Sequence, residues 1–154
     1  MSIRYVRSTL EHADFLARNL RAGDLEELNA GGIAEQEDLT SALRSPLLMQ
    51  GETLTLLVDG VPAAMFGVVD LGNGRGGPWL LGTTVLDQNK RLLLTDARVV
   101  VQNMMNQFEV LENLIFEGSK TNRRWLRWLG FSEDDPFPHP ETGELFIRFH
   151  WRKQ

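Results

Sequence analysis

Hydrophobic residues follow a helical spacing in the first third of the chain. After a strand over residues 3–8, apolar residues recur on one helix face, and Ser8 or Thr9 is placed to cap that helix. The residues of this face are Leu10, Ala13, Leu16, Ala17 and Leu20. Two further short helices are predicted over residues 24–29 and 33–43, and the second is expected to end before Pro46.

The middle of the chain changes to the pattern of strands. Residues 52–58 and 62–71 form two predicted strands joined by the hairpin signal Asp59-Gly60. A third strand is predicted over residues 79–86, after the glycine-rich stretch 72–77. A phosphate-binding loop would need a helix after such glycines, but Pro78 and Trp79 open a strand. The stretch is therefore interpreted as a hairpin loop in an antiparallel meander.

The second half combines a long helix with a strand–helix unit. The predicted helix over residues 89–108 has an apolar stripe, and a buried strand over 111–117 follows it. A helix over 119–129 then ends at Gly130, and Phe131 begins a short strand. A proline-rich loop leads to a last strand over 145–151. These elements predict one α+β domain over residues 1–154, with a mostly antiparallel sheet flanked by helices. The stripe is formed by Leu93, Ala97, Val100, Met104 and Phe108.

Composition and charge narrow the classes of function. The 154 residues include no cysteine, and the net charge of −5 argues against nucleic acid as a partner. No stretch is apolar enough for a signal peptide or a membrane span, so a cytoplasmic protein is expected. The acidic residues gather in two patches, which are expected to be solvated faces. These patches contain Asp24, Glu26, Glu27, Glu35, Glu37 and Asp38, and then Glu133, Asp134, Asp135, Glu141 and Glu144.

Two further patterns leave alternatives open. On the helix over 119–129, Trp125, Trp128 and Leu129 are spaced to pack into a core, although with the nearby arginines they also resemble a partner surface. At the start of the long helix, Lys90 and Arg91 oppose the helix dipole unless an anion binds there. His12, His139 and His150 lack the spacing of metal ligands, so structural or surface roles are expected.

Segments of the second half together resemble a known family. Their shared features are a strand led by tryptophan, a long helix, an asparagine-containing strand, and a short helix that ends in glycine. The segments are Trp79-Leu80-Leu81-Gly82-Thr83, Asp96–Phe108, Leu111–Phe116, and Gly118-Ser119 through Arg124-Trp125-Leu126 to Leu129-Gly130. Residues 62–152 in this order resemble the internal virion protein A family of short-tailed phages of the T7 type. The whole order of elements resembles the GNAT (Gcn5-related N-acetyltransferase) fold.

The GNAT resemblance implies a site for acetyl-CoA. Backbone groups of Thr83 and Val85 would meet the pantetheine arm, and the pyrophosphate would lie at the start of the long helix near Lys90 and Arg91. Ser119 and Asn122 stand where the family's following helix begins. A carboxylate would deprotonate the acceptor amine, and Glu117 is the candidate base. The acidic patches would favour a cationic amine.

The sequence also departs from the GNAT pattern. The pyrophosphate loop of that family carries glycines, and none occurs in residues 88–94. Leu126 stands where many members have an acid tyrosine, and the single tyrosine of this chain is Tyr5. The favoured hypothesis is therefore a phage protein that acts in virion morphogenesis or host interaction with degenerate catalytic motifs. It would bind virion or host proteins in the host cytoplasm, with homo-oligomers possible. The alternative is an active acetyl-CoA-dependent N-acyltransferase.

Overall fold

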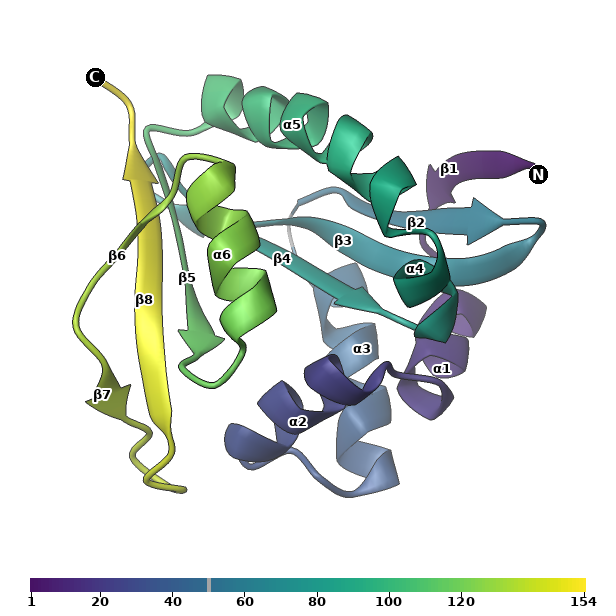
Figure 1. The fold of residues 1–154 in the computed structure, drawn as a ribbon, viewed down its shortest axis with the longest axis horizontal. Coiled ribbons are helices and arrows are strands. Elements are labelled where there is room, and N and C mark those ends of the chain that lie inside the picture. The colour runs from purple at the N-terminus through teal and green to yellow at the C-terminus, as the bar shows by residue number, and fades with distance from the viewer. Residues whose placement is uncertain (50) are drawn as a thin grey trace.

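The structure is a computed structural model that describes residues 1–49 and 51–154; at Lys90 and residues 92–94 it describes the backbone alone. Its strands and helices follow the predicted order closely (Figure 1). In chain order they are β1 (Ile3–Arg7), α1 (Leu10–Arg18), α2 (Ala22–Ala30), α3 (Gln36–Leu48), β2 (Thr53–Val58), β3 (Val61–Gly72), β4 (Arg75–Gly82), α4 (Thr84–Gln88), α5 (Lys90–Gln107), β5 (Val110–Phe116), α6 (Lys120–Trp128), β6 (Ser132–Glu133), β7 (Phe137–Pro138) and β8 (Leu145–Arg152).

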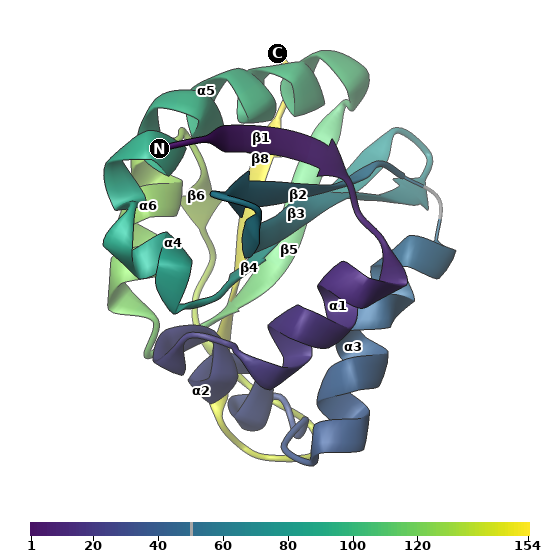
Figure 2. The ribbon, with the colours of Figure 1, turned by 90° about the vertical axis from the view of Figure 1, so that its right-hand side faces the viewer.

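The strands form one mixed sheet. Its order is β1-β2-β3-β4-β5-β8-β6, and β7 also pairs with β8. Every pairing is antiparallel except that of β4 with β5, which run parallel. The predicted α+β class, with a mostly antiparallel sheet flanked by helices, is confirmed. Figure 2 shows α4, α5 and α6 on one side of the sheet and α1 and α3 on the other.

Side chains that point alternately to the two faces of the sheet form a hydrophobic core on each face. Met65 packs with the buried residues Leu16 of α1 and Leu43 of α3. Its neighbour Phe66 points to the opposite face and joins a cluster that includes Val100 of α5. Since successive side chains of a strand point to opposite faces, one strand serves both layers.

The helix α1 begins with a reciprocal cap. The hydroxyl of Thr9 accepts a hydrogen bond from the His12 amide, and His12 Nδ1 accepts one from the Thr9 amide, both at 3.2 Å. Burial lowers the pKa of His12, which favours the neutral ring that can accept this bond. This arrangement fulfils the role of a capping box, with histidine in the place of glutamate.

Two predicted boundaries are wrong. Helix α3 does not end before Pro46 but continues to Leu48, because a proline in the last turn removes only one helical hydrogen bond. Strand β4 ends at Gly82, and Thr83 then caps the short helix α4 by accepting a hydrogen bond from the Val85 amide. The residues after Gly82 were predicted to continue the strand.

The glycine-rich stretch is shorter as a loop than predicted. The turn lies at Asn73 and Gly74, which have φ angles of 54° and 75°. Gly72 is the last residue of β3 and pairs with Arg75, so Gly76 and Gly77 belong to β4. A hairpin turn between two strands is therefore confirmed, and this turn directs β4 along the middle of the sheet.

Strands β4 and β5 meet only at their first residues. They pair at Arg75 with Val110 and at Gly76 with Leu111, and beyond these positions they diverge (Figure 1). The closed end of this fork lies at the start of both strands. Its open end lies at Gly82 and Phe116.

Within the described part of the chain, no helix is long and apolar enough to cross a membrane.

Candidate functional site

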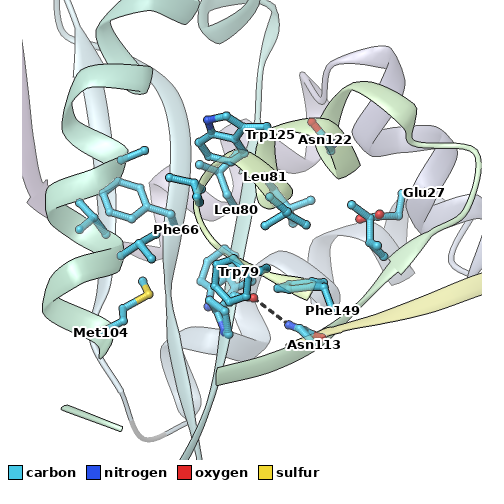
Figure 3. A pocket seen from close by; sticks show the side chains of 18 of the residues that line it. Glu27, Phe66, Trp79, Leu80, Leu81, Met104, Asn113, Asn122, Trp125 and Phe149 are labelled. Carbon is cyan, nitrogen blue, oxygen red and sulfur yellow. Dashed lines mark hydrogen bonds between the residues drawn. The ribbon is translucent and has the colours of Figure 1, made fainter. Parts of the chain in front are cut away.

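A cavity of about 300 Å³ lies in the fork between β4 and β5. On one face of the sheet its walls include Leu80 and Phe66, beneath α5. On the other face they include Trp79, Leu81 and Glu27, which lie toward α1 and α2 (Figure 3). Because the two strands separate here, the cavity connects the two faces of the sheet.

Asn113 bridges the two strands toward the closed end of the fork. Its side-chain amide donates to the Pro78 carbonyl of β4 at 2.9 Å, which is the dashed line in Figure 3. Its side-chain carbonyl accepts from the Leu114 amide of β5 at 2.8 Å. One polar side chain thus satisfies a backbone acceptor and a backbone donor that the separated strands cannot offer each other.

Arg21 and Asp24, at the start of α2, form a strap that binds Gly82 at the end of β4. Asp24 is almost fully buried, and its Oδ2 accepts from the Gly82 amide at 2.7 Å and from Nε of Arg21 at 2.6 Å. The Arg21 amide in turn donates to the Gly82 carbonyl at 2.9 Å. Both backbone groups of Gly82 that point into the fork are therefore engaged.

Between Pro78, which Asn113 binds, and Gly82, which the strap binds, the backbone of Leu80 stays unpaired on this edge. In an antiparallel pair, backbone groups point alternately toward and away from the neighbouring strand. Gly76, Pro78 and Gly82 direct theirs toward β5, so Leu80 does the same. The β4–β5 pairing ends at Gly76, and in the described part of the chain no loop or side chain bonds the Leu80 amide or carbonyl on this edge. One donor and one acceptor on a strand edge therefore face the cavity.

Glu27 supplies a carboxylate on the α2 side of the cavity. Its Oε1 accepts a hydrogen bond from the Phe116 amide of β5 at 3.0 Å. Burial raises the pKa of Glu27 from 4.5 to about 6, although the Phe116 hydrogen bond and the charge of Arg21 act in the opposite direction. A carboxyl group with this pKa can both hold and release a proton near neutral pH.

Helix α6 lines the cavity with Asn122, Trp125 and Leu126. The indole Nε1 of Trp125 is buried, and no acceptor lies within reach in the described part of the chain. A buried donor without a partner is rare in folded proteins and costs about 1–3 kcal/mol. An acceptor on a bound molecule would remove that cost.

Acetyltransferases are among the solved structures with this architecture. One is AAC(6')-Ib in complex with paromomycin and acetyl-CoA, with a TM-score of 0.71, 17% identity, and coverage of 100% of this chain and 95% of that one. Another is a GNAT-family acetyltransferase from Streptococcus pneumoniae, with a TM-score of 0.65, 14% identity, and coverage of 99% and 100%. The chain has the GNAT fold. These identities establish the fold alone.

A third similar structure is that of a protein acetyltransferase. RimL, a ribosomal L7/L12 alpha-N-protein acetyltransferase in complex with coenzyme A, has a TM-score of 0.68 at 6% identity and covers 99% of this chain and 94% of its own. Neither a family model nor a curated protein matches this sequence. The resemblance to a phage virion family therefore has no support from these comparisons.

Thr83 and Val85, the expected pantetheine contacts on the GNAT fold, are engaged inside the protein. The Thr83 amide donates to Ala63, and its hydroxyl donates to the Pro62 carbonyl at 3.0 Å. The Val85 amide donates to Thr83 Oγ1, and its carbonyl accepts from the Asn89 side chain at 2.8 Å. The free backbone groups are instead those of Leu80, three residues earlier than the first of them.

The other predicted cofactor-binding residues lie at the starts of α5, where phosphates were expected, and of α6. Arg91 is exposed in the first turn of α5, whereas the side chain of Lys90 lies outside the described residues. Ser119 is the N-cap residue of α6 and makes no side-chain capping bond, and Asn122 lines the cavity one turn later. Among the predicted site residues whose side chains the structure describes, Asn122 is the one on the cavity wall.

Glu117, the predicted base, lies outside the cavity lining. Its side chain is 40% exposed and lies 3.7 Å from Arg123, to which its backbone carbonyl is also hydrogen-bonded. Among the described residues, two carboxylates do line the cavity: Asp96, which accepts a hydrogen bond from the Tyr5 hydroxyl, and Glu27, which was assigned to a solvated acidic face together with Asp24. Sequence reasoning missed the burial of Glu27 and Asp24 because it depends on β4 and β5, far away in the chain.

Proposed function

We propose that this protein is an acyl-CoA-dependent N-acyltransferase whose reaction centre is the cavity between β4 and β5. One observation carries the proposal. The cavity joins an open strand position at Leu80, on the side of α5 and α6, to the buried carboxylate of Glu27 on the side of α2. Two substrates could thus approach each other from opposite faces of the sheet. The coenzyme A and acetyl-CoA complexes of the GNAT structures support this assignment.

The residues around the cavity fit the chemical groups of acyl-CoA. The amide and carbonyl of Leu80 suit the alternating donors and acceptors of a pantetheine arm, which would extend the edge of β4. The orphaned Nε1 of Trp125 can donate to a carbonyl or a sulfur. Arg91, with Lys90, would attract phosphates at the start of α5, where the helix dipole also favours an anion.

Glu27 is positioned to act as the base. In acyl transfer from a CoA thioester to an amine, a C–N bond forms, the C–S bond breaks, the nitrogen loses a proton and the departing thiolate gains one. Glu27 holds Oε1 against the Phe116 amide, and within the described part of the chain Oε2 has no partner. With a pKa of about 6, this carboxylate is largely ionised at neutral pH and can take the proton from nitrogen.

The acceptor is proposed to be a cationic amine, either a small molecule or a protein group. Glu27 lies on a helix that also carries the exposed Glu26, and Glu117 stands just beyond the end of β5. An acidic approach to the cavity would draw a protonated amine, which must lose a proton before it can attack. Aminoglycosides and a protein N-terminus are named for the solved neighbours.

Calorimetric titration with acetyl-CoA tests the proposal. Micromolar binding is expected, and the double variant Lys90→Ala/Arg91→Ala should weaken it at least tenfold because about two charge-assisted phosphate contacts are removed. Arg152→Ala/Lys153→Ala removes the same two charges at the end of the chain and serves as the matched control. Equal affinity of both double variants would contradict the placement of the phosphates. Absence of heat with millimolar acetyl-CoA would contradict the proposed function.

A second candidate is a binding role in phage morphogenesis or host interaction without catalysis. Its specific support is the segment between β4 and α5, where the short helix α4 and the engaged groups of Gly82 leave one open position on the strand edge. Virion or host proteins would be the partners, in the host cytoplasm or the virion, and a homo-oligomer is possible. The absence of any CoA binding, with the fold intact, would favour this candidate.

A further inference from the structure

The cavity continues past Leu80 toward the closed end of the fork. There its walls come from α5, α6, β5 and β8 rather than from the strand edge. Register fixes the direction, because Asn113 pairs with Phe149, whereas the open end of β5 at Phe116 pairs with Phe146. The wall residues of this inner part are Met104, Leu129, Phe131 and Phe149, and Ile115 stands at its mouth, level with Leu80.

These five side chains form an apolar enclosure. Four of them belong to one buried cluster, and Leu129 packs against it. Phe131 and Phe149 meet edge to face with ring centroids 5.2 Å apart, which fixes one wall. Met104 lies in the last full turn of α5 and closes the opposite side (Figure 3). No charged group stands among these wall residues, so a carboxylate or an ammonium group would be buried here without a partner.

We infer that this inner part binds the acyl group, and that it takes an unbranched apolar chain of butanoyl length or longer in preference to acetyl. The inference rests on the proposed function, since it uses the same thioester site. With phosphates at the start of α5 and the thioester at Leu80, an acyl chain points toward the closed end. The walls of this inner part are residues of the core cluster, and an acetyl group at Leu80 would reach few of them, whereas added methylene groups would contact more.

Burial of a methylene group sets the expected size of the effect. Each one should tighten binding about fourfold until the enclosure is full. From acetyl-CoA to butanoyl-CoA, which adds two methylene groups, the dissociation constant should therefore fall about fifteenfold. Succinyl-CoA has a chain of the same length with a terminal carboxylate, and it should bind more weakly than butanoyl-CoA because its charge would be desolvated.

The test is a calorimetric series with coenzyme A and its acetyl, butanoyl, hexanoyl and succinyl thioesters. Met104→Ala enlarges the inner end and should shift the preference toward hexanoyl-CoA. Ile147→Ala is the matched control, because Ile147 belongs to the same core cluster as Met104 and lies outside the cavity lining. Both variants should lose stability, but only Met104→Ala should change the order of affinities.

The outcomes separate the two claims. Tight binding of acetyl-CoA with no gain for butanoyl-CoA would overturn the acyl-chain inference and leave the proposed function standing. A gain that Ile147→Ala shifts as much as Met104→Ala would also overturn it, because the chain would then bind elsewhere. If neither coenzyme A nor any thioester binds the folded protein, both claims fail.

Discussion

At the scale of single residues, the polar side chains around the fork differ in how well they are satisfied. Asp24 and Asn113 complete hydrogen bonds that the diverging strands lack. Glu27 has one such bond but is mostly buried, so burial works against its charge. Trp125 has a buried donor with no acceptor in the described part of the chain. Unfavourable groups that gather at one cavity indicate a site for a ligand rather than a region built for stability.

Replacement of Glu27 by glutamine should change how stability depends on pH. The folded-state pKa of about 6 exceeds the ordinary 4.5, so the folded chain holds the proton more tightly than the unfolded chain. This tighter proton binding stabilises the folded chain fully below pH 4.5, and the stabilisation is lost as the pH rises through about 6. Relative to the parent, Glu27→Gln should gain about 1–2 kcal/mol in unfolding free energy between pH 4.5 and pH 7.

Urea unfolding at a series of pH values measures this difference. Glu26→Gln is the matched control, because it alters an exposed carboxylate on the same helix. A constant difference in unfolding free energy between Glu27→Gln and the parent would mean that the Glu27 carboxyl has an ordinary pKa. If the chain is an acyltransferase, Glu27→Gln should also abolish the rise in kcat/KM around pH 6.

Trp125→Phe isolates the orphaned indole N–H. Loss of ring area and removal of an unsatisfied donor oppose each other, so the unfolding free energy should change by less than about 1 kcal/mol. Affinity for acetyl-CoA should fall about fivefold, the value of one hydrogen bond. Trp128→Phe provides the comparison, since Trp128 is 47% exposed and packs against Arg98 on the surface. Equal affinity in the two variants would show that Trp125 donates no bond to the ligand.

At the scale of elements, the strap joins the start of α2 to the last residue of β4. It occupies the edge of β4 with which β5 would otherwise pair. Leu20 and Thr83 form an isolated bridge beside the bonds from Arg21 and Asp24 to Gly82. These contacts end β4 and fix the first helices against the centre of the sheet. Without them, the edge of β4 would be free along its whole open half.

Asp24→Ala should therefore be strongly destabilising. It leaves the mostly buried guanidinium of Arg21 and the Gly82 amide without their shared acceptor, which should lower the unfolding free energy by about 3–5 kcal/mol. Asp24→Asn keeps an acceptor for Gly82 and should lose less. Asp14→Ala breaks an exposed ion pair with Arg44 and should hardly shift the urea midpoint. Similar midpoints for Asp24→Ala and Asp14→Ala would refute the strap.

The same strap explains where sequence-based prediction stops. Periodicity and caps predicted most helices and strands, because those signals lie within a few residues of each element. The end of β4 was placed four residues too late, since Thr83, Thr84 and Val85 favour a strand while distant Asp24 fixes Gly82 as its last residue. Asn113 offered a signal, as a polar residue within the apolar strand LENLIF, but its partner Pro78 could not be predicted.

At the scale of the whole molecule, the cavity lies between parts of the chain that are far apart in the sequence. The start of α2, strand β4, and helices α5 and α6 all contribute walls, and β4 pairs with β5 only at the closed end. A ligand that enters the fork would therefore join the two halves of the sheet where the backbone does not. Its binding free energy adds directly to the stability of the folded chain.

Acetyl-CoA should therefore raise the melting temperature of the whole protein. At a concentration of one hundred times the dissociation constant, binding adds about 2.7 kcal/mol, or roughly 5–10 °C for a chain of this size. The shift should shrink in the Lys90→Ala/Arg91→Ala variant at the same ligand concentration and persist in Arg152→Ala/Lys153→Ala. A shift equal in both would indicate binding away from the start of α5. No shift in any of them would contradict the binding of acetyl-CoA. It would favour the second candidate, in which the GNAT fold binds other proteins and the fork holds no cofactor.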